Sequence, residues 1–256
     1  MPQQRSMRCW RQSYGRHNSG FSLVEVALVL AVLGVIAAAA AAAYLGLFSA
    51  GRTKLNSDAS LATISGSVVA FAKSRHRLPC PDTDGSGNEG VCSAGPGGPE
   101  VGWFPYLSVG LSLPAPDARA VYGVYRVAGA DLARAEEHGG DLAGAATYAD
   151  GADLVRALQA AALTALSSGH IYLTGDGATG GAENCGSNVV SNPAFVVIAP
   201  GEDRDGDGKR VDGIHSTLPG SGRCFAAPAR AVDTNFDDRT FAISFYELMA
   251  KLNNEL

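Results

Sequence analysis

The sequence lacks the short motifs that position catalytic groups. It contains no G-x-S-x-G, H-E-x-x-H or S-x-x-K pattern and no phosphate-binding P-loop. Beyond residue 20 its histidines are widely separated, at His76, His138, His170 and His215. The sequence therefore predicts a protein that is not an enzyme, with a membrane-anchored periplasmic hydrolase as the alternative.

Basic residues are scarce beyond the first twenty positions. The chain has 20 Lys and Arg against 25 Asp and Glu, which gives a formal net charge of −5. The segment 1–20 carries Arg5, Arg8, Arg11 and Arg16 and no acid. No basic stripe with interleaved aromatic residues follows, so we expect no nucleic acid as a partner. A basic start before an acidic remainder is typical of a targeting segment.

Cysteine is also scarce, and no C-x-x-C or C-x-x-H pattern favours a zinc site. Apart from Cys9, the cysteines are Cys80, Cys92, Cys185 and Cys224. An even number fits an exported, disulfide-bonded protein, and four cysteines allow three connectivities. We favour Cys80–Cys92 and Cys185–Cys224 because each closes a local loop, with stabilisation of about 3 and 4 kcal/mol. Four buried thiols are the alternative.

One long apolar run dominates the N-terminal part. Residues 26–48 are 23 consecutive uncharged residues, and a helix of that length spans roughly 35 Å against about 30 Å for a hydrocarbon core. The arginines before the run place residues 1–20 in the cytoplasm and the rest outside. A signal peptide cleaved within 37–43 and a plain signal anchor are the alternatives. Neither explains Glu25, because a carboxylate beside an apolar span is costly without a partner.

The stretch Gly20-Phe21-Ser22-Leu23-Val24-Glu25, between its basic leader and the apolar run, resembles the processing signal of type IV pilins and pseudopilins. In that family a prepilin peptidase cleaves after the glycine and N-methylates the new first residue. The resemblance implies cleavage between Gly20 and Phe21, with Glu25 as the fifth mature residue. It also implies two kinds of assembly partner, which are other pilin or pseudopilin subunits and an inner-membrane assembly platform.

The charges at the start of the mature chain would find partners on assembly. Cleavage frees an amine on Phe21, which stays basic after methylation, and Glu25 lies about one helical turn away. In a stack of parallel helices, Glu25 of one subunit can meet the Phe21 amine of a neighbour and so set the register. The alternative is that Glu25 caps the start of its own helix.

The sequence predicts an α+β fold, in which a pilin-like N-terminal helix packs on an antiparallel β-sheet. We expect a leader at 1–20, a helix over 21–76 that spans the membrane at about 22–48, and an extracytoplasmic head at 77–256. The helix face that packs on the head consists of apolar residues at helical spacing. These residues are Leu61, Ile64, Val68 and Phe71.

Within the head, strands and helices follow from composition and end signals. Segments rich in β-branched and aromatic residues predict strands at 120–127, 170–175, 193–201 and 239–245. A helix is expected over 152–169, stopped by Gly169. Ser244 and Glu247 form a capping box for a last helix. The Ala- and Gly-rich segment 128–168 has no counterpart in the resemblance.

Two acidic turns have the spacing of calcium-binding loops, in which alternate residues supply oxygens and a glycine permits a sharp turn. The stronger turn, GEDRDGDGKRVDG, offers Asp203, Asp205, Asp207 and Asp212. The acidic twelfth residue of an EF-hand is absent, because Ile214 stands there. Some pseudopilins use calcium to hold a C-terminal loop, so the resemblance also favours Ca2+. A solvated Asp-Gly turn is the alternative. The weaker turn offers Asp82, Asp84 and Ser86.

These features predict a structural subunit of a type IV pilus-like or type II secretion pseudopilus fibre. Before assembly, the subunit would be a single-pass protein of a bacterial inner membrane, surrounded by membrane lipid, with a periplasmic head. The alternative function is a membrane-anchored binding module, adhesin-like or cargo-binding.

Overall fold

The structure is a computed structural model that describes residues 22–92, 98–134, 150–176 and 182–253. The chain divides into two compact units, Met1–Gly51 and Arg52–Leu256, which we call the N-terminal and C-terminal units. Gly20 and Phe21, where processing is expected, lie outside the described residues, as does the leader.

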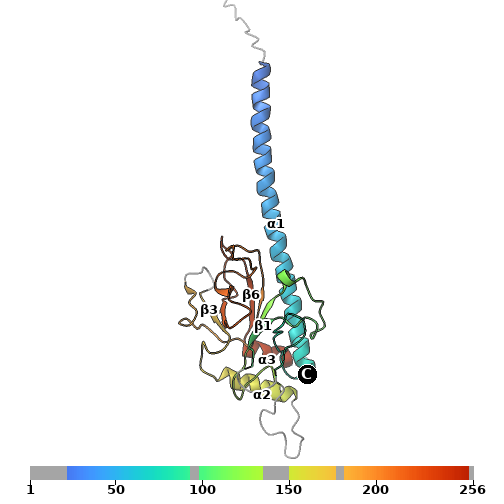
Figure 1. Cartoon of the computed structure of the whole chain (residues 1–256), viewed down its shortest axis with the longest axis vertical. Helices are drawn as coiled ribbons and strands as arrows, with labels where there is room; N and C mark the ends of the chain where they lie inside the picture. The colour runs from blue at the N-terminus through green and yellow to red at the C-terminus, as the bar shows by residue number, and fades with distance from the viewer. Residues whose placement is uncertain (1–21, 93–97, 135–149, 177–181, 254–256) are drawn as a thin grey trace, which may run out of the picture. The chain divides into compact units, whose positions relative to one another are not determined.

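The first helix, α1, runs from Leu23 to Arg75 (Figure 1). Ser22 caps its start, since the Ser22 hydroxyl accepts a hydrogen bond from the Val24 N–H (3.3 Å) and the Ser22 carbonyl accepts one from the Glu25 N–H (2.9 Å). At the other end, His76 has a left-handed φ of 56°, which ends the helix.

In the N-terminal unit, the segment Leu23–Ala41 of α1 is long and apolar enough to cross a membrane, and none of it is buried. Leu23 is 87% exposed and Val35 is 70% exposed. A continuous apolar surface of this kind is unfavourable in water, so the segment needs lipid or other apolar helices around it.

The C-terminal unit contains a four-stranded antiparallel sheet in the order β1-β2-β4-β6. Its strands are β1 (Val101–Trp103), β2 (Val121–Val124), β4 (Phe195–Ala199) and β6 (Arg239–Ile243). The last three fall inside predicted strands. The sequence does not predict β1, because a strand of three residues with a central glycine shows no clear β pattern.

A second sheet has two parallel strands, β3 (Tyr172–Thr174) and β5 (Cys224–Ala226). The sequence predicts β3 but not the short β5. This sheet packs closely on β2 at Gly123, where a Cβ would lie 3.1 Å from side-chain atoms of both Ile171 and Phe225. Glycine at this position therefore lets the two layers approach.

The core of the C-terminal unit lies between α1 and the sheets. Every residue of β2 and β4 is buried. Leu61, Ile64 and Val68 of α1 belong to the same buried cluster, and Phe71 is also buried. The predicted helix face is thus confirmed, and each such side chain contributes about 1.5–3 kcal/mol by its removal from water.

Helix α2 (Gly151–Ala162) lies beside α3 (Phe245–Asn253) (Figure 1). The prediction that the first of these continues to Gly169 is wrong. The N–H of Ser167 donates to the Asn192 side-chain oxygen (3.0 Å), and the Asn192 amide donates back to the Ser167 carbonyl (2.8 Å). This tertiary contact turns the chain where the local sequence favours a helix.

Short 3-10 turns among the described residues include η1 (Pro116–Ala118) and η3 (Gly213–His215). At the start of α3 the Glu247 N–H donates to the Ser244 hydroxyl (3.2 Å), which is one of the two hydrogen bonds of the expected capping box; the Glu247 carboxylate lies 3.6 Å from Nζ of Lys251. Two disulfides join Cys80 to Cys92 and Cys185 to Cys224, with Cα atoms 5.9 and 5.6 Å apart. These are the pairs that the sequence favours.

The buried hydroxyl of Tyr122 leads to a prediction about the stability of the chain. Its side chain is fully buried in β2, and its hydroxyl has no hydrogen-bond partner among the described residues. Tyr122→Phe removes this orphaned hydroxyl and keeps the ring contact with Phe104 (5.7 Å between centroids). Because an unsatisfied buried polar group costs about 1–3 kcal/mol, the variant should melt at a higher temperature, measured by circular dichroism of the purified chain in detergent.

The matched control is Tyr106→Phe. Tyr106 is also buried, but its hydroxyl accepts the Ala120 N–H (3.0 Å). Its removal leaves that N–H without a partner, so this variant should melt at a lower temperature than wild type. A decrease in melting temperature for Tyr122→Phe would contradict the prediction.

Candidate functional site

The first candidate site is Glu25, in the first turn of α1. Counting from the N-cap Ser22, Glu25 is the third helical residue, where the helix dipole favours an anion. A capping-box carboxylate reaches back to the N-cap N–H from this same position. The side chain is exposed, so it is accessible to a partner outside the chain.

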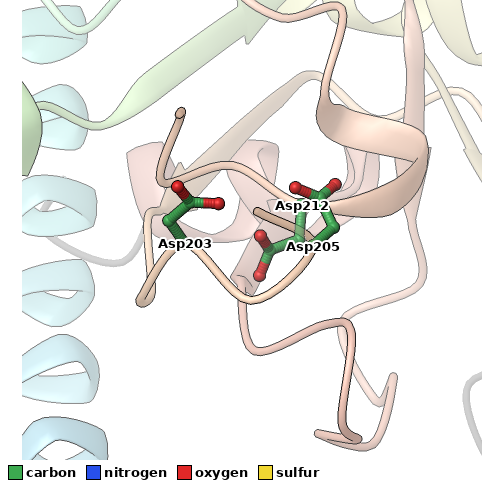
Figure 2. Close-up of side chains that lie close together, drawn as sticks. All are labelled: Asp203, Asp205 and Asp212. Carbon is green, nitrogen blue, oxygen red and sulfur yellow. The ribbon is translucent and has the colours of Figure 1, made fainter. Parts of the chain in front are cut away.

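The second candidate site is the acidic loop that follows β4. The structure brings Asp203, Asp205 and Asp212 together, with one oxygen of each within 4.8 Å of the others (Figure 2). The fourth predicted ligand, Asp207, is not in this group. Its carboxylate instead accepts the Lys209 N–H (2.8 Å).

Backbone N–H groups hold the first two carboxylates in place. The two oxygens of Asp203 accept hydrogen bonds from Gly206 (2.9 Å) and Gly208 (3.0 Å). Those of Asp205 accept from Asp207 (3.1 Å) and Gly213 (3.2 Å). The chain can turn this sharply because Gly206 and Gly208 have positive φ values of 76° and 84°. A carboxylate oxygen with one such bond keeps a lone pair for a cation.

Asp212 is fully buried, unlike the two exposed carboxylates beside it. Its oxygens accept the N–H groups of Arg204 (3.1 Å) and Asp237 (3.4 Å). Burial, followed by the negative charges of Asp238 and Asp237, raises the pKa of Asp212 to about 6. The ionised form is therefore disfavoured in the absence of a positive charge.

Asp238 holds this loop in place through hydrogen bonds. It accepts hydrogen bonds from the Asp212 N–H (2.9 Å) and from Nδ1 of His215 (2.8 Å), and both side chains are fully buried. Because Nε2 of His215 accepts the Ala226 N–H (2.9 Å), the ring carries its single proton on Nδ1 and is neutral. Both ring nitrogens are thus occupied by structural bonds, so this Asp–His pair holds the loop and has no free atom for proton transfer.

Asp237 completes a second acidic group with Asp212 and Asp238. Nε of Arg204 lies 2.7 Å from its carboxylate, and this hydrogen bond raises the pKa of Arg204. The sequence pattern does not predict Asp237, Asp238 or His215 as members of the site. The available signal was a pair of adjacent acids just before the predicted strand at 239–245.

The weaker acidic turn repeats the backbone of the stronger one. Asp82 accepts the N–H groups of Asp84, Gly85 and Gly87 at 3.1, 2.8 and 2.6 Å. Gly85 and Gly87 have φ values of 75° and 84°, as Gly206 and Gly208 do. However, Asp82 is fully buried, and the turn contributes to no group of three or more candidate metal ligands among the described residues.

Comparison with known proteins identifies the N-terminal segment. Residues 15–41 match the family model of the prokaryotic N-terminal methylation motif. The chain thus carries a type IV pilin-like prepilin signal, and its α+β fold with an apolar N-terminal helix is consistent with a pilin-like protein. No curated protein and no solved structure matches the chain.

Proposed function

We propose that this protein is a structural subunit of a type IV pilus-like or type II secretion pseudopilus fibre. The observation that carries the proposal is the methylation motif over residues 15–41, which includes Gly20, Phe21 and Glu25. A motif of this kind implies processing by a prepilin peptidase and assembly with other pilins. Before assembly the subunit sits in the inner membrane of a bacterium, with its C-terminal unit in the periplasm.

The exposed segment Leu23–Ala41 supports this role. It is apolar, and none of it is buried within the chain, so it is stable only in lipid or against other apolar helices. Transfer from lipid to a bundle of subunits keeps the segment out of water throughout. Glu25 makes the transfer selective, because its carboxylate gains an ionic partner when the Phe21 amine of a neighbour lies beside it.

We propose further that the acidic loop binds Ca2+ through Asp203, Asp205 and Asp212. Three carboxylates with oxygens within 4.8 Å of one another repel in the absence of a cation. Calcium prefers such oxygen ligands in a flexible arrangement. Bound there, the ion would tie the loop after β4 to the buried Asp212 and stabilise the C-terminal unit.

The first prediction concerns the processing step at Gly20. Gly20→Val places a branched side chain beside the scissile peptide and should block the approach of the peptidase. The membrane fraction should then contain only the full-length precursor, heavier than the mature chain by residues 1–20, as measured by intact mass spectrometry. A wild-type mature chain that begins at any residue other than Phe21 would contradict the proposal, and a start near Ala43 would indicate an ordinary signal peptide.

The second prediction concerns assembly through Glu25. Glu25→Ala should still be cleaved after Gly20, but it should be largely absent from the sheared-fibre fraction, because the neighbouring amine loses its buried partner at a cost of several kcal/mol, about 3–5. Glu25→Gln is the matched variant, since glutamine can still cap the helix start but carries no charge. If Glu25→Gln assembles as well as wild type, Glu25 acts as a cap and not through an ion pair.

The third prediction concerns calcium. Addition of Ca2+ should raise the melting temperature of the purified chain, and a chelator should reverse the rise. Asp205→Ala should abolish the effect, because it removes one of the three clustered carboxylates. Asp84→Ala is the matched control, since it changes the equivalent residue of the other turn and should leave the calcium response intact. Identical melting curves of the wild type with calcium and with chelator would exclude the site.

A further inference from the structure

Two acidic groups share the carboxylate of Asp212. The first acidic group is the proposed calcium site, in which Asp212 lies with Asp203 and Asp205, and the second combines Asp212 with Asp237 and Asp238. In each group the candidate oxygens lie within 4.8 Å of one another. Carboxylates this close repel unless a positive charge lies beside them. Each group is therefore stabilised by a cation, and the two differ in whether the chain supplies one.

The chain supplies a cation to the second acidic group. Nε of Arg204 lies 2.7 Å from Oδ2 of Asp237, and Nη1 of Arg204 donates to the Asp233 carbonyl (3.1 Å). Together these bonds fix the orientation of the guanidinium, and the bond to the carboxylate is short, as expected for a charge-assisted hydrogen bond. The positive charge of the second group is thus a side chain of the protein itself.

The first acidic group has no such partner. Among the residues that the structure describes, none of Asp203, Asp205 and Asp212 forms an ion pair with Lys, Arg or His. The donors to their oxygens are backbone N–H groups. The nearby Lys209 pairs instead with Asp207 (3.8 Å). A positive charge for the first group must therefore come from solution.

Gly201 accommodates the carboxylate that Arg204 neutralises. A Cβ at Gly201 would lie 1.6 Å from Oδ1 of Asp237, so a larger residue at this position would displace that carboxylate. The φ of Gly201 is not positive, so backbone strain does not explain the glycine. The space instead admits Asp237, which also accepts the Glu202 N–H (3.1 Å). The position of Asp237 is therefore fixed by the fold.

Arg204 also contacts the shared member of the two groups. It stands between Asp203 and Asp205 in the sequence, and its backbone N–H donates to Oδ1 of Asp212 (3.1 Å). Its side chain meanwhile lies on Asp237. A divalent ion placed in the second group would lie close to the guanidinium, and two like charges at short range repel.

We propose that the guanidinium of Arg204 is the resident cation of the second acidic group and so confines the loop to a single Ca2+, bound by Asp203, Asp205 and Asp212. This inference rests on the proposed calcium site, because it identifies the residue that sets the number of ions there. Arg204 is a positioning residue, which acts through Asp237 and does not itself bind the ion.

Equilibrium dialysis against radioactive calcium tests the number of ions, with the full chain purified in detergent. Wild type should bind one Ca2+ per chain at saturation. Arg204→Ala leaves Asp237 without its counter-charge, so this variant should bind two. Saturating calcium should also raise its melting temperature by more than it raises that of wild type, because the second ion replaces the lost charge. Arg204→Lys keeps a positive charge and should bind one.

Two further variants show where the second ion lies. Arg210→Ala is the matched control, since Nε of Arg210 donates to the Gly201 carbonyl (2.6 Å) on the same loop, while its guanidinium pairs with Asp117 (3.4 Å) and not with Asp237. It should bind one ion. The double variant Arg204→Ala/Asp237→Asn removes both charges of the pair and should also bind one.

The outcomes separate this inference from the calcium site. One ion, no ion or an unfolded chain for Arg204→Ala at saturating calcium would overturn the role of Arg204, because calcium should replace the guanidinium. Two ions on the double variant would overturn it as well, since the second ion would then lie away from Asp237. A wild-type chain that binds no calcium would overturn the calcium site itself, while the fibre role stands.

Discussion

The exposed apolar segment Leu23–Ala41 of α1 determines the surroundings in which this protein can be stable. Leu23–Ala41 has no covering within the chain, so its surroundings must always be supplied from outside, by lipid or by other helices. The C-terminal unit does not depend on this segment for its own core. The C-terminal unit forms a separate compact body with its own buried cluster, so it can fold while the apolar segment remains in a different environment.

The sequence predicts the parts of the fold that depend on local patterns. Helical spacing is sufficient to identify Leu61, Ile64 and Val68 as the buried face of α1, and segments rich in β-branched and aromatic residues identify β2, β4 and β6. Contacts between distant segments are not visible in such patterns. The end of α2 depends on the Ser167–Asn192 bonds, and β5 is a strand because it pairs with β3. The three residues of β5 are too few, and too ordinary in composition, to predict a strand.

The acidic loop likewise combines residues that a local pattern predicts with residues that only the tertiary structure reveals. The alternation of Asp203 and Asp205 before glycine is a local pattern, and the structure places these residues together with Asp212. Asp237 and Asp238 enter from a segment about 25 residues further along the chain, at hydrogen-bond distances to Asp212. A linear spacing rule also includes Asp207, whose side chain turns back to the Lys209 N–H. The geometry of the turn, and not its composition, decides which carboxylates meet.

The disulfide between Cys80 and Cys92 has a mechanical consequence. In the proposed fibre, a pulling force would pass along α1, which ends at Arg75, five residues before Cys80. Leu61, Ile64 and Val68 anchor the buried face of α1 in the core, so a pull along the helix axis would have to shear these contacts together. If the chain beyond α1 begins to extend, the covalent link to Cys92 prevents the loop between the two cysteines from lengthening. The force would then reach β1, at the edge of the antiparallel sheet, so the sheet and the core, and not the loop closed by the disulfide, would set the resistance to extension.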